Sequence, residues 1–277
     1  MGLHMRKRPG LAVATLALVL TLTGCGARAV SGTPSGDGHL FDNAQELVRA
    51  ATGETDQVKS AKFSMTMTVA GQPVTGQGEG RFDGDNTAMR MSMTASGIDE
   101  EMLYVGKKIY LQVPEQYRDQ LTSGKPWGQF PENSNFSKVM GAAQAQQNDP
   151  KQMLQQIQEA GTITRSAQET LDGKPATHYW IDVDVAKSVD KLAQSGLSQA
   201  QLQGMASKVK TVPMQLWLNE DLLPVQITED MTELMRAAGA PASTQNMTLT
   251  MKYTDWGIPV DVQAPPADEV GDIELPN

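Results

Sequence analysis

VTGQGEGRF, residues 74–82, alternates in the manner of a β-strand, yet the middle of one of its two faces carries no side chains. The odd positions are polar, and the even positions are Val74, Gly76, Gly78, Gly80 and Phe82. Alternation with period two is typical of a strand that has one buried face. Glycine weakens a strand interior because it costs backbone entropy and packs nothing. The sequence therefore predicts a strand whose buried face either touches a covering helix closely or borders empty volume.

The segments around this strand alternate in the same way. Strand patterns cover residues 63–69 and 89–94, and they resume over 162–185, 212–228 and 246–256. Short turns such as Gly106-Lys107 and Leu171–Lys174 connect them. Helical patterns cover residues 42–51, which end at Thr52-Gly53, and 150–160. The order, a helix and then antiparallel strands, occurs twice. We expect one domain, because neither half has enough helix to cover its own sheet.

Methionine is frequent, with 16 residues, and much of it falls on the apolar face of the predicted strands. Methionine is flexible and polarizable, and it lines surfaces that adapt to variable apolar partners. The pattern predicts a deformable apolar pocket, and ordinary core filler is the alternative. The predicted lining residues are Met65, Met67, Val69, Met89, Met91, Met93, Leu216, Leu218, Leu249 and Met251, with Gly76, Gly78 and Gly80 supplying room.

The N-terminus has the pattern of a bacterial lipoprotein signal. Three basic residues at 6–8 precede an apolar run, Leu11–Leu22, that is too short to cross a bilayer comfortably. The run ends in Leu22-Thr23-Gly24-Cys25, which resembles a lipobox. An uncleaved anchor, or a cytosolic chain with an apolar start, is the alternative.

The predicted organisation follows from this signal and from composition. It comprises a signal peptide at 1–24, a lipidated Cys25 with a flexible tether over 25–41, a domain over 42–262, and an acidic, proline-rich tail over 263–277.

Composition excludes several classes of function. The net charge of −9 argues against nucleic acid, which needs clustered Lys and Arg. A single cysteine excludes an intramolecular disulfide and a multi-thiolate metal site. Of the three histidines only His178 falls in the predicted domain, where we interpret it as a partly exposed sheet residue rather than a catalytic base. Asp182 and Asp184 share a strand face and could hold a cation, but a solvated face is the simpler interpretation. We expect no enzyme, no cofactor and no metal.

Three further stretches resemble one family. They are SAKFSM at 60–65, LDGKPATHY at 171–179 and YTDWGIPV at 253–260. Together with the lipobox, they resemble the LppX/LprAFG-type actinobacterial lipoproteins. The resemblance implies an α+β, LolA/LolB-like fold, in which a curved antiparallel β half-barrel packs over helices around an apolar cavity. The Gln-rich stretch 144–158 departs from the pattern.

The expected function is that of a lipoprotein anchored to the extracytoplasmic face of the cell membrane. It would bind the acyl chains of a lipid or glycolipid and carry them across the envelope, and we expect it to be a monomer. Its expected partners are the ligand, the membrane through the acyl chains on Cys25, and a membrane transporter. The alternative is a sensor or scaffold lipoprotein that binds a membrane protein without transporting a ligand.

Overall fold

The computed structural model describes residues 41–69, 72–95, 98–130, 149–188, 198–241 and 246–273. Cys25, the signal peptide and residues 26–40 of the tether lie outside the described residues, as does most of the Gln-rich stretch before residue 149. Within the described part of the chain, no helix has both the length and the hydropathy that a membrane span requires.

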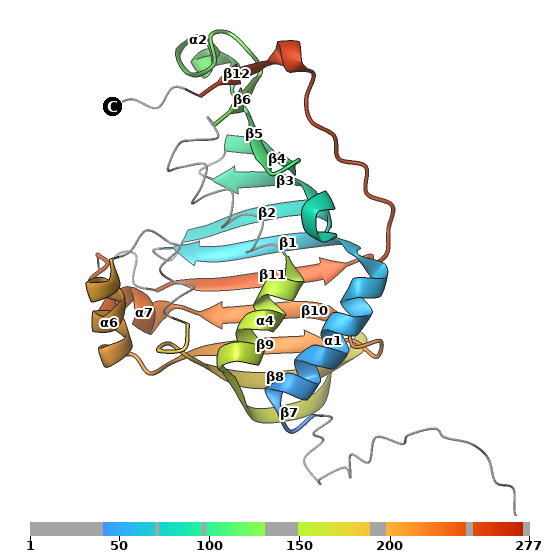
Figure 1. The fold of residues 1–277 in the computed structure, drawn as a ribbon, viewed down its shortest axis with the longest axis vertical. Coiled ribbons are helices and arrows are strands. Elements are labelled where there is room, and N and C mark those ends of the chain that lie inside the picture. Colours follow the sequence, from blue (N-terminus) through green and yellow to red (C-terminus); the bar gives the residue numbers. More distant parts are fainter. Residues whose placement is uncertain are drawn as a thin grey trace, which may run out of the picture. The chain divides into compact units, whose positions relative to one another are not determined.

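Twelve strands form one open sheet (Figure 1), which confirms the predicted fold class. Their order is β12-β6-β5-β4-β3-β2-β1-β11-β10-β9-β8-β7, and each neighbouring pair is antiparallel except β12 with β6. The strands are β1 Ser60–Val69, β2 Gln72–Arg81, β3 Ala88–Ala95, β4 Ile98–Val105, β5 Lys108–Gln112, β6 Trp127–Gln129, β7 Gly161–Leu171, β8 Lys174–Asp184, β9 Thr211–Leu218, β10 Pro224–Asp230, β11 Thr248–Thr254 and β12 Val270–Asp272.

Two of the predicted turns form tight hairpins. The loops Gly106-Lys107 and Asp172-Gly173 each place both of their residues at positive φ, between 51° and 80°. Two consecutive residues of that conformation match the right-handed twist of the flanking strands. These turns set the register of β4 with β5 and of β7 with β8.

The helices are α1 Ala44–Val58, α2 Arg118–Leu121, α4 Pro150–Ala160, α6 Gln199–Lys208 and α7 Thr232–Ala237, with short 3-10 turns η1 Gly84–Asn86, η2 Glu115–Tyr117 and η5 Ala267–Glu269. In Figure 1, α1 and α4 lie across the part of the sheet formed by β8 to β11, and β2 to β5 extend beyond them. We call the face that carries α1 and α4 the inner face, and the opposite one the outer face.

Helix α1 runs past its predicted end at Thr52-Gly53 and stops at Val58. Its N-cap is Asn43, whose side chain accepts a hydrogen bond from the backbone N–H of Glu46. The Thr55 hydroxyl is buried and donates to the carbonyl of Ala51 at 2.8 Å. Packing against α4 and the sheet therefore outweighs the unfavourable helix propensity of Gly53.

Side chains from α1 and α4 fill the space above the inner face. The helix residues buried there are Leu47, Val48, Ala51, Met153, Leu154 and Ile157. They belong to one hydrophobic core with sheet residues such as Tyr179, Met214 and Tyr253. The helices are thus held to the sheet mainly by the hydrophobic effect.

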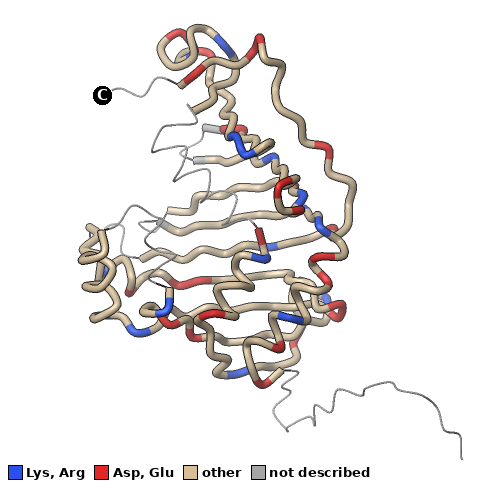
Figure 2. Tube along the Cα trace, viewed as in Figure 1, with Lys and Arg blue, Asp and Glu red and all other residues tan. Residues whose placement is uncertain are grey.

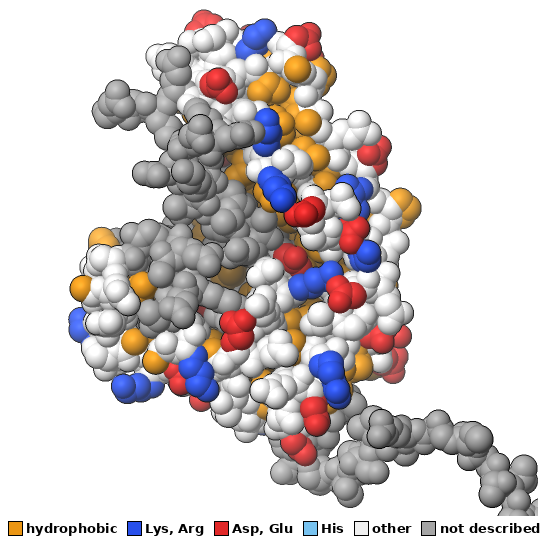
Figure 3. All heavy atoms as spheres, viewed as in Figure 1, with side chains coloured by type: hydrophobic (Ala, Val, Ile, Leu, Met, Phe, Trp, Pro, Cys, Tyr) orange, Lys and Arg blue, Asp and Glu red, His pale blue; other side chains and the backbone are white. Residues whose placement is uncertain are grey.

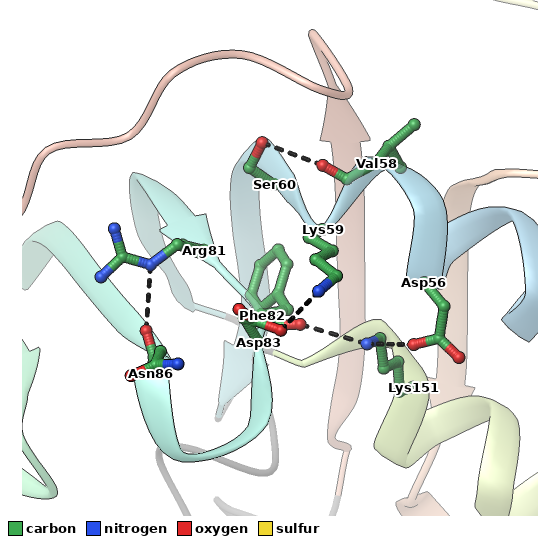
Figure 4. Close-up of polar contacts among 9 residues, drawn as sticks. All are labelled: Asp56, Val58, Lys59, Ser60, Arg81, Phe82, Asp83, Asn86 and Lys151. Atoms are coloured by element: carbon green, nitrogen blue, oxygen red, sulfur yellow. Dashed lines mark hydrogen bonds and ion pairs between the residues drawn. The ribbon is translucent and has the colours of Figure 1, made fainter.

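A polar link joins the end of α1, the end of β2 and the start of α4 (Figure 4). Lys59 Nζ lies 2.8 Å from Asp83 Oδ1, and the backbone N–H of Phe82 donates to the carbonyl of Lys59 at 2.7 Å. Lys151, one residue into α4, forms an ion pair with Asp56 and donates to the carbonyl of Phe82 at 3.1 Å. These contacts set the position of α4 relative to the strands beneath it.

At Gly78 and Gly80 of β2, the space where a Cβ would lie is occupied neither by a helix nor by a void. A Cβ on Gly78 would lie 2.2 Å from the carbonyl oxygen of Arg90 and 2.8 Å from Phe63 Cζ. A Cβ on Gly80 would lie 2.8 Å from Phe82 Cζ. Both alternatives drawn from the sequence are corrected here, because two phenylalanine rings of the chain itself lie against the bare backbone. An aromatic ring over a strand glycine is a known way of compensating for the missing side chain.

The segment predicted as a tail contributes to the sheet. Val270–Asp272 pairs in parallel with Trp127–Gln129, and the backbone N–H of Ile273 donates to the carbonyl of Gln129 at 2.8 Å. Glycines at 128 and 271 permit this approach, since a Cβ on Gly271 would lie 2.4 Å from the carbonyl oxygen of Thr122. A parallel strand this short is difficult to predict from sequence, because three residues are too few to show alternation.

Replacing Gly78 by alanine should lower the free energy of unfolding by about 1–3 kcal/mol or more, because the new methyl group meets backbone. The matched control is Gly76→Ala on the same strand, where a Cβ would lie 3.4 Å from Met93 Cγ, in ordinary contact. That change should stay within about 0.5 kcal/mol of the parent or stabilise slightly. Urea denaturation measures both, and equal effects of the two substitutions would contradict this account of the glycines.

Candidate functional site

The predicted lining residues divide into two groups. Five of them retain 2% or less of their accessible surface; they are Met89, Met91, Leu216, Leu218 and Met251. A side chain that lines a cavity wide enough for an acyl chain keeps accessible surface, so these five are packed core in this structure. The space between α1, α4 and the sheet is filled there by the helix side chains and by the rings of Phe63 and Phe82.

The other group is partly exposed and lies at one end of the central strands. We call Met65, Met67, Met93 and Leu249 the methionine patch; each is half-buried. Three of these residues also pack against the buried core; they are Met65, Met93 and Leu249. The patch is therefore an accessible apolar extension of the core.

Strand register brings the patch together from three strands, β1, β3 and β11, around Gly76 of β2. Met65 pairs with Gly76, which in turn pairs with Met93. Met67 pairs with Leu249 on its other side. Directly paired residues of antiparallel strands have Cβ atoms about 5 Å apart, so these side chains form one surface. Val69 continues β1, but its side chain lies outside what the structure describes.

One acidic side chain lies on the inner face beside the patch. Glu229 on β10 pairs with Leu249, which pairs with Met67, so the three form a row across neighbouring strands. Burial raises the pKa of the Glu229 carboxyl, and a hydrogen bond with Gln156 of α4 opposes that rise. This carboxyl carried no signal in the sequence, because alternation assigns Glu229 to a face but does not show that Leu249 and Gln156 lie beside it.

Two hollows, of about 410 and 630 Å³, lie on the sheet between β11 and β3. Their linings are mainly outer-face polar residues, such as Ser64, Gln77 and Ser92. A third hollow of about 660 Å³ lies over the exposed side of α1. None of these three opens between the helices and the sheet.

His178 is buried, which corrects the expectation of a partly exposed residue. It is 4% exposed and stacks on the outer face with Trp217, ring centroids 3.9 Å apart, and with Trp180, 3.4 Å apart. Its Nδ1 lies 3.3 Å from Glu169 Oε1. Burial nevertheless lowers the pKa of His178 below its ordinary value, outweighing the nearby Glu169 carboxylate. The imidazole is therefore neutral at neutral pH and serves as part of an aromatic cluster.

The paired aspartates of β8 do not gather further ligands. Asp184 accepts a hydrogen bond from the backbone N–H of Lys187 at 3.2 Å. Among the residues that the structure describes, no three His, Cys, Asp or Glu side chains gather as they would around a metal ion.

Comparison with known proteins gives distant similarities. No family model matches the chain. It is 27% identical over 164 residues to an uncharacterized 31.2 kDa protein of the rplA-rplJ intergenic region of Streptomyces griseus, an alignment that covers 55% of this chain and 50% of the relative. The chain thus spans about half the length of that relative.

Two solved structures are similar to this chain at low sequence identity. The Mycobacterium tuberculosis lipoprotein LppX is 13% identical, over 79% of this chain and 98% of its own, with a TM-score of 0.49. LprF from Mycobacterium bovis is 12% identical, over 80% and 96%, with a TM-score of 0.47. Because both TM-scores lie below 0.5, the function is inferred from the contacts of this chain alone.

The buried His178 gives stability a specific pH dependence. Its pKa is lowered on folding, so the unfolded chain binds the proton more readily and stability falls as the pH drops below about 6.5, the ordinary value. The loss is complete once the pH is below the folded pKa. Replacing His178 with Phe should remove this pH-dependent loss of stability. The unfolding free energy of the variant, relative to that of the parent, should therefore be higher at pH 5 than at pH 7.5. Urea denaturation at both values measures it, and a pH-independent difference would contradict the assignment.

Proposed function

We propose that this chain is a membrane-anchored lipoprotein whose methionine patch binds the acyl chain of a lipid. The observation that carries the proposal is the patch itself. It is a half-buried, methionine-rich surface that continues the core, with side chains from β1, β3 and β11 around Gly76 of β2. In Figure 2 the left-hand parts of β1, β2 and β11, where the patch lies, are largely free of charged positions.

The energetics of this surface suit reversible binding. An acyl chain gains about 0.8 kcal/mol for each methylene that leaves water. About six methylenes therefore contribute roughly 5 kcal/mol, which corresponds to binding in the millimolar range before ordering costs. Flexible thioether side chains adapt to chains of different shape, which suits a site for acyl groups rather than for one rigid ligand.

The predicted N-terminal anchor supports the same function. Acyl groups on Cys25 would hold the chain at the extracytoplasmic face of the membrane. The patch would then operate close to a bilayer that supplies ligand at high local concentration. We further propose that the protein carries the bound lipid across the envelope.

Deeper insertion of an acyl chain would require the helices to move. The core beneath α1 and α4 is filled, and α4 is held at its start by the contacts of Lys151 with Asp56 and Phe82 (Figure 4). Entry below α4 would therefore break an ion pair and separate packed side chains. In the described arrangement the ligand contacts the methionine patch and not the buried residues beside it.

A second function has one observation in its favour. The filled space beneath the helices suits a sensor or scaffold lipoprotein, which would bind a membrane-protein partner and carry no ligand. Hydrophobic side chains are visible on the same side of the molecule in the upper part of the view, beside β5 and β6 (Figure 3). A partner could use such a surface.

Replacing Met67 with Asp should reduce acyl-chain binding about tenfold, because a carboxylate must be desolvated where the chain would lie. The full chain, reconstituted in phosphatidylcholine vesicles, is irradiated with a monoacylglycerol whose chain carries a diazirine, and cross-linked protein is quantified. The matched control is Thr66→Asp, which adds the same charge to an exposed outer-face position of the same strand.

Cross-linking should concentrate in peptides from 60–69 and 246–254, and Thr66→Asp should keep the parent yield. A parent chain that cross-links no more than an unrelated anchored protein would overturn lipid binding and favour the sensor or scaffold.

A further inference from the structure

The charged residues of the central sheet are divided between its two faces. On β10, β11 and β1 to β4 every Lys and Arg alternates onto the outer face; these residues are Lys62, Arg81, Arg90 and Lys252. Each of these four residues lies on the face opposite to the one that carries the methionines. The register thus leaves the inner face of these six strands without a basic side chain.

Acidic residues, in contrast, reach the inner face at both ends of the methionine patch. Glu229 pairs with Leu249 at one end, and Glu100 pairs with Met93 at the other. Glu100 is exposed, whereas Glu229 is partly buried. A ligand that lies along the patch therefore meets carboxyl groups wherever its polar end projects along the sheet.

Glu229 is held in place for such a contact. Gln156 from α4 hydrogen-bonds to its side chain, and burial raises the pKa of its carboxyl. Lys151, at the start of α4, is engaged by Asp56 and the carbonyl of Phe82. A carboxyl group in this setting hydrogen-bonds with a hydroxyl, and in its ionised form it repels a second anion strongly because the surroundings screen poorly.

We propose that Glu229 selects the headgroup of the bound lipid, accepting an uncharged, hydroxyl-bearing headgroup of the acylglycerol class and excluding a carboxylate. This inference rests on the proposed lipid-binding function. Glu229 forms the polar end of the ligand site, and Leu249 and Met67 form its apolar end. Glu229 contacts the headgroup, and Gln156 positions the carboxyl.

Two probes that differ only in the headgroup test this assignment. The full chain in phosphatidylcholine vesicles at pH 8 is irradiated with a diazirine-bearing monoacylglycerol, or with the diazirine-bearing fatty acid of the same chain length. Cross-linking yield is divided by the amount of each probe in the vesicles. The parent chain should favour the monoacylglycerol about tenfold. Glu229→Gln should raise the fatty-acid yield about tenfold and change the monoacylglycerol yield less than twofold.

The matched control is Asp230→Asn. It makes the same change in net charge at the next residue, which alternates onto the outer face. It should leave the ratio of the two yields as it is in the parent. If Asp230→Asn alters the ratio as much as Glu229→Gln does, the preference comes from the overall charge and the assignment falls.

The remaining outcomes separate the two proposals. Equal yields of the two probes in the parent overturn headgroup selection but do not contradict lipid binding. This measurement uses the parent chain, so it holds even if Glu229→Gln does not fold. An unchanged ratio in folded Glu229→Gln also overturns it. Absence of cross-linking by either probe in the parent overturns the proposed function itself.

Discussion

The contact of two phenylalanine rings with bare strand backbone is the constraint on which the inner face depends. Phe63 and Phe82 lie where the side chains of Gly78 and Gly80 would be, closer than any Cβ could tolerate. Phe63 of β1 and Phe82, the residue after β2, cover these glycines, and α1 and α4 close over the neighbouring part of the sheet. Packing at this density leaves little room, because protein interiors are filled to the density of organic crystals.

This constraint divides the methionines into two kinds. Met89, Met91 and Met251 lie beside the rings or below the helices and are fully packed. Met93 lies farther along β3, Met65 and Met67 lie on β1, and all three remain partly exposed. The same residue type thus serves as core filler at one end of a strand and as an adaptable surface at the other. The boundary between the two is where a ligand site can begin without unfolding the core.

Electrostatics on the sheet reinforces that division. The basic side chains of the central strands lie on the outer face, where Lys62 pairs with Asp255 and Arg90 with Glu101. Among the residues that the structure describes, Glu229 and Glu100 place carboxyl groups on the inner face beside the methionine patch, and the chain carries a net charge of −9. An apolar surface bordered by acids favours the apolar part of an amphiphile and disfavours an anionic head.

Much of the architecture was readable from the chain. Alternation with period two located the strands, the turns at Gly106-Lys107 and Asp172-Gly173 set hairpins, and the methionines of β1 and β3 were assigned to one face. These are local properties, since side chains alternate along a strand whatever its partners. Three features needed tertiary structure: the rings that occupy the glycine gaps, the burial of His178 between two tryptophans, and the short parallel strand near the C-terminus. Each depends on contacts between residues distant in sequence, and alternation specifies the face of a side chain without specifying what will cover it.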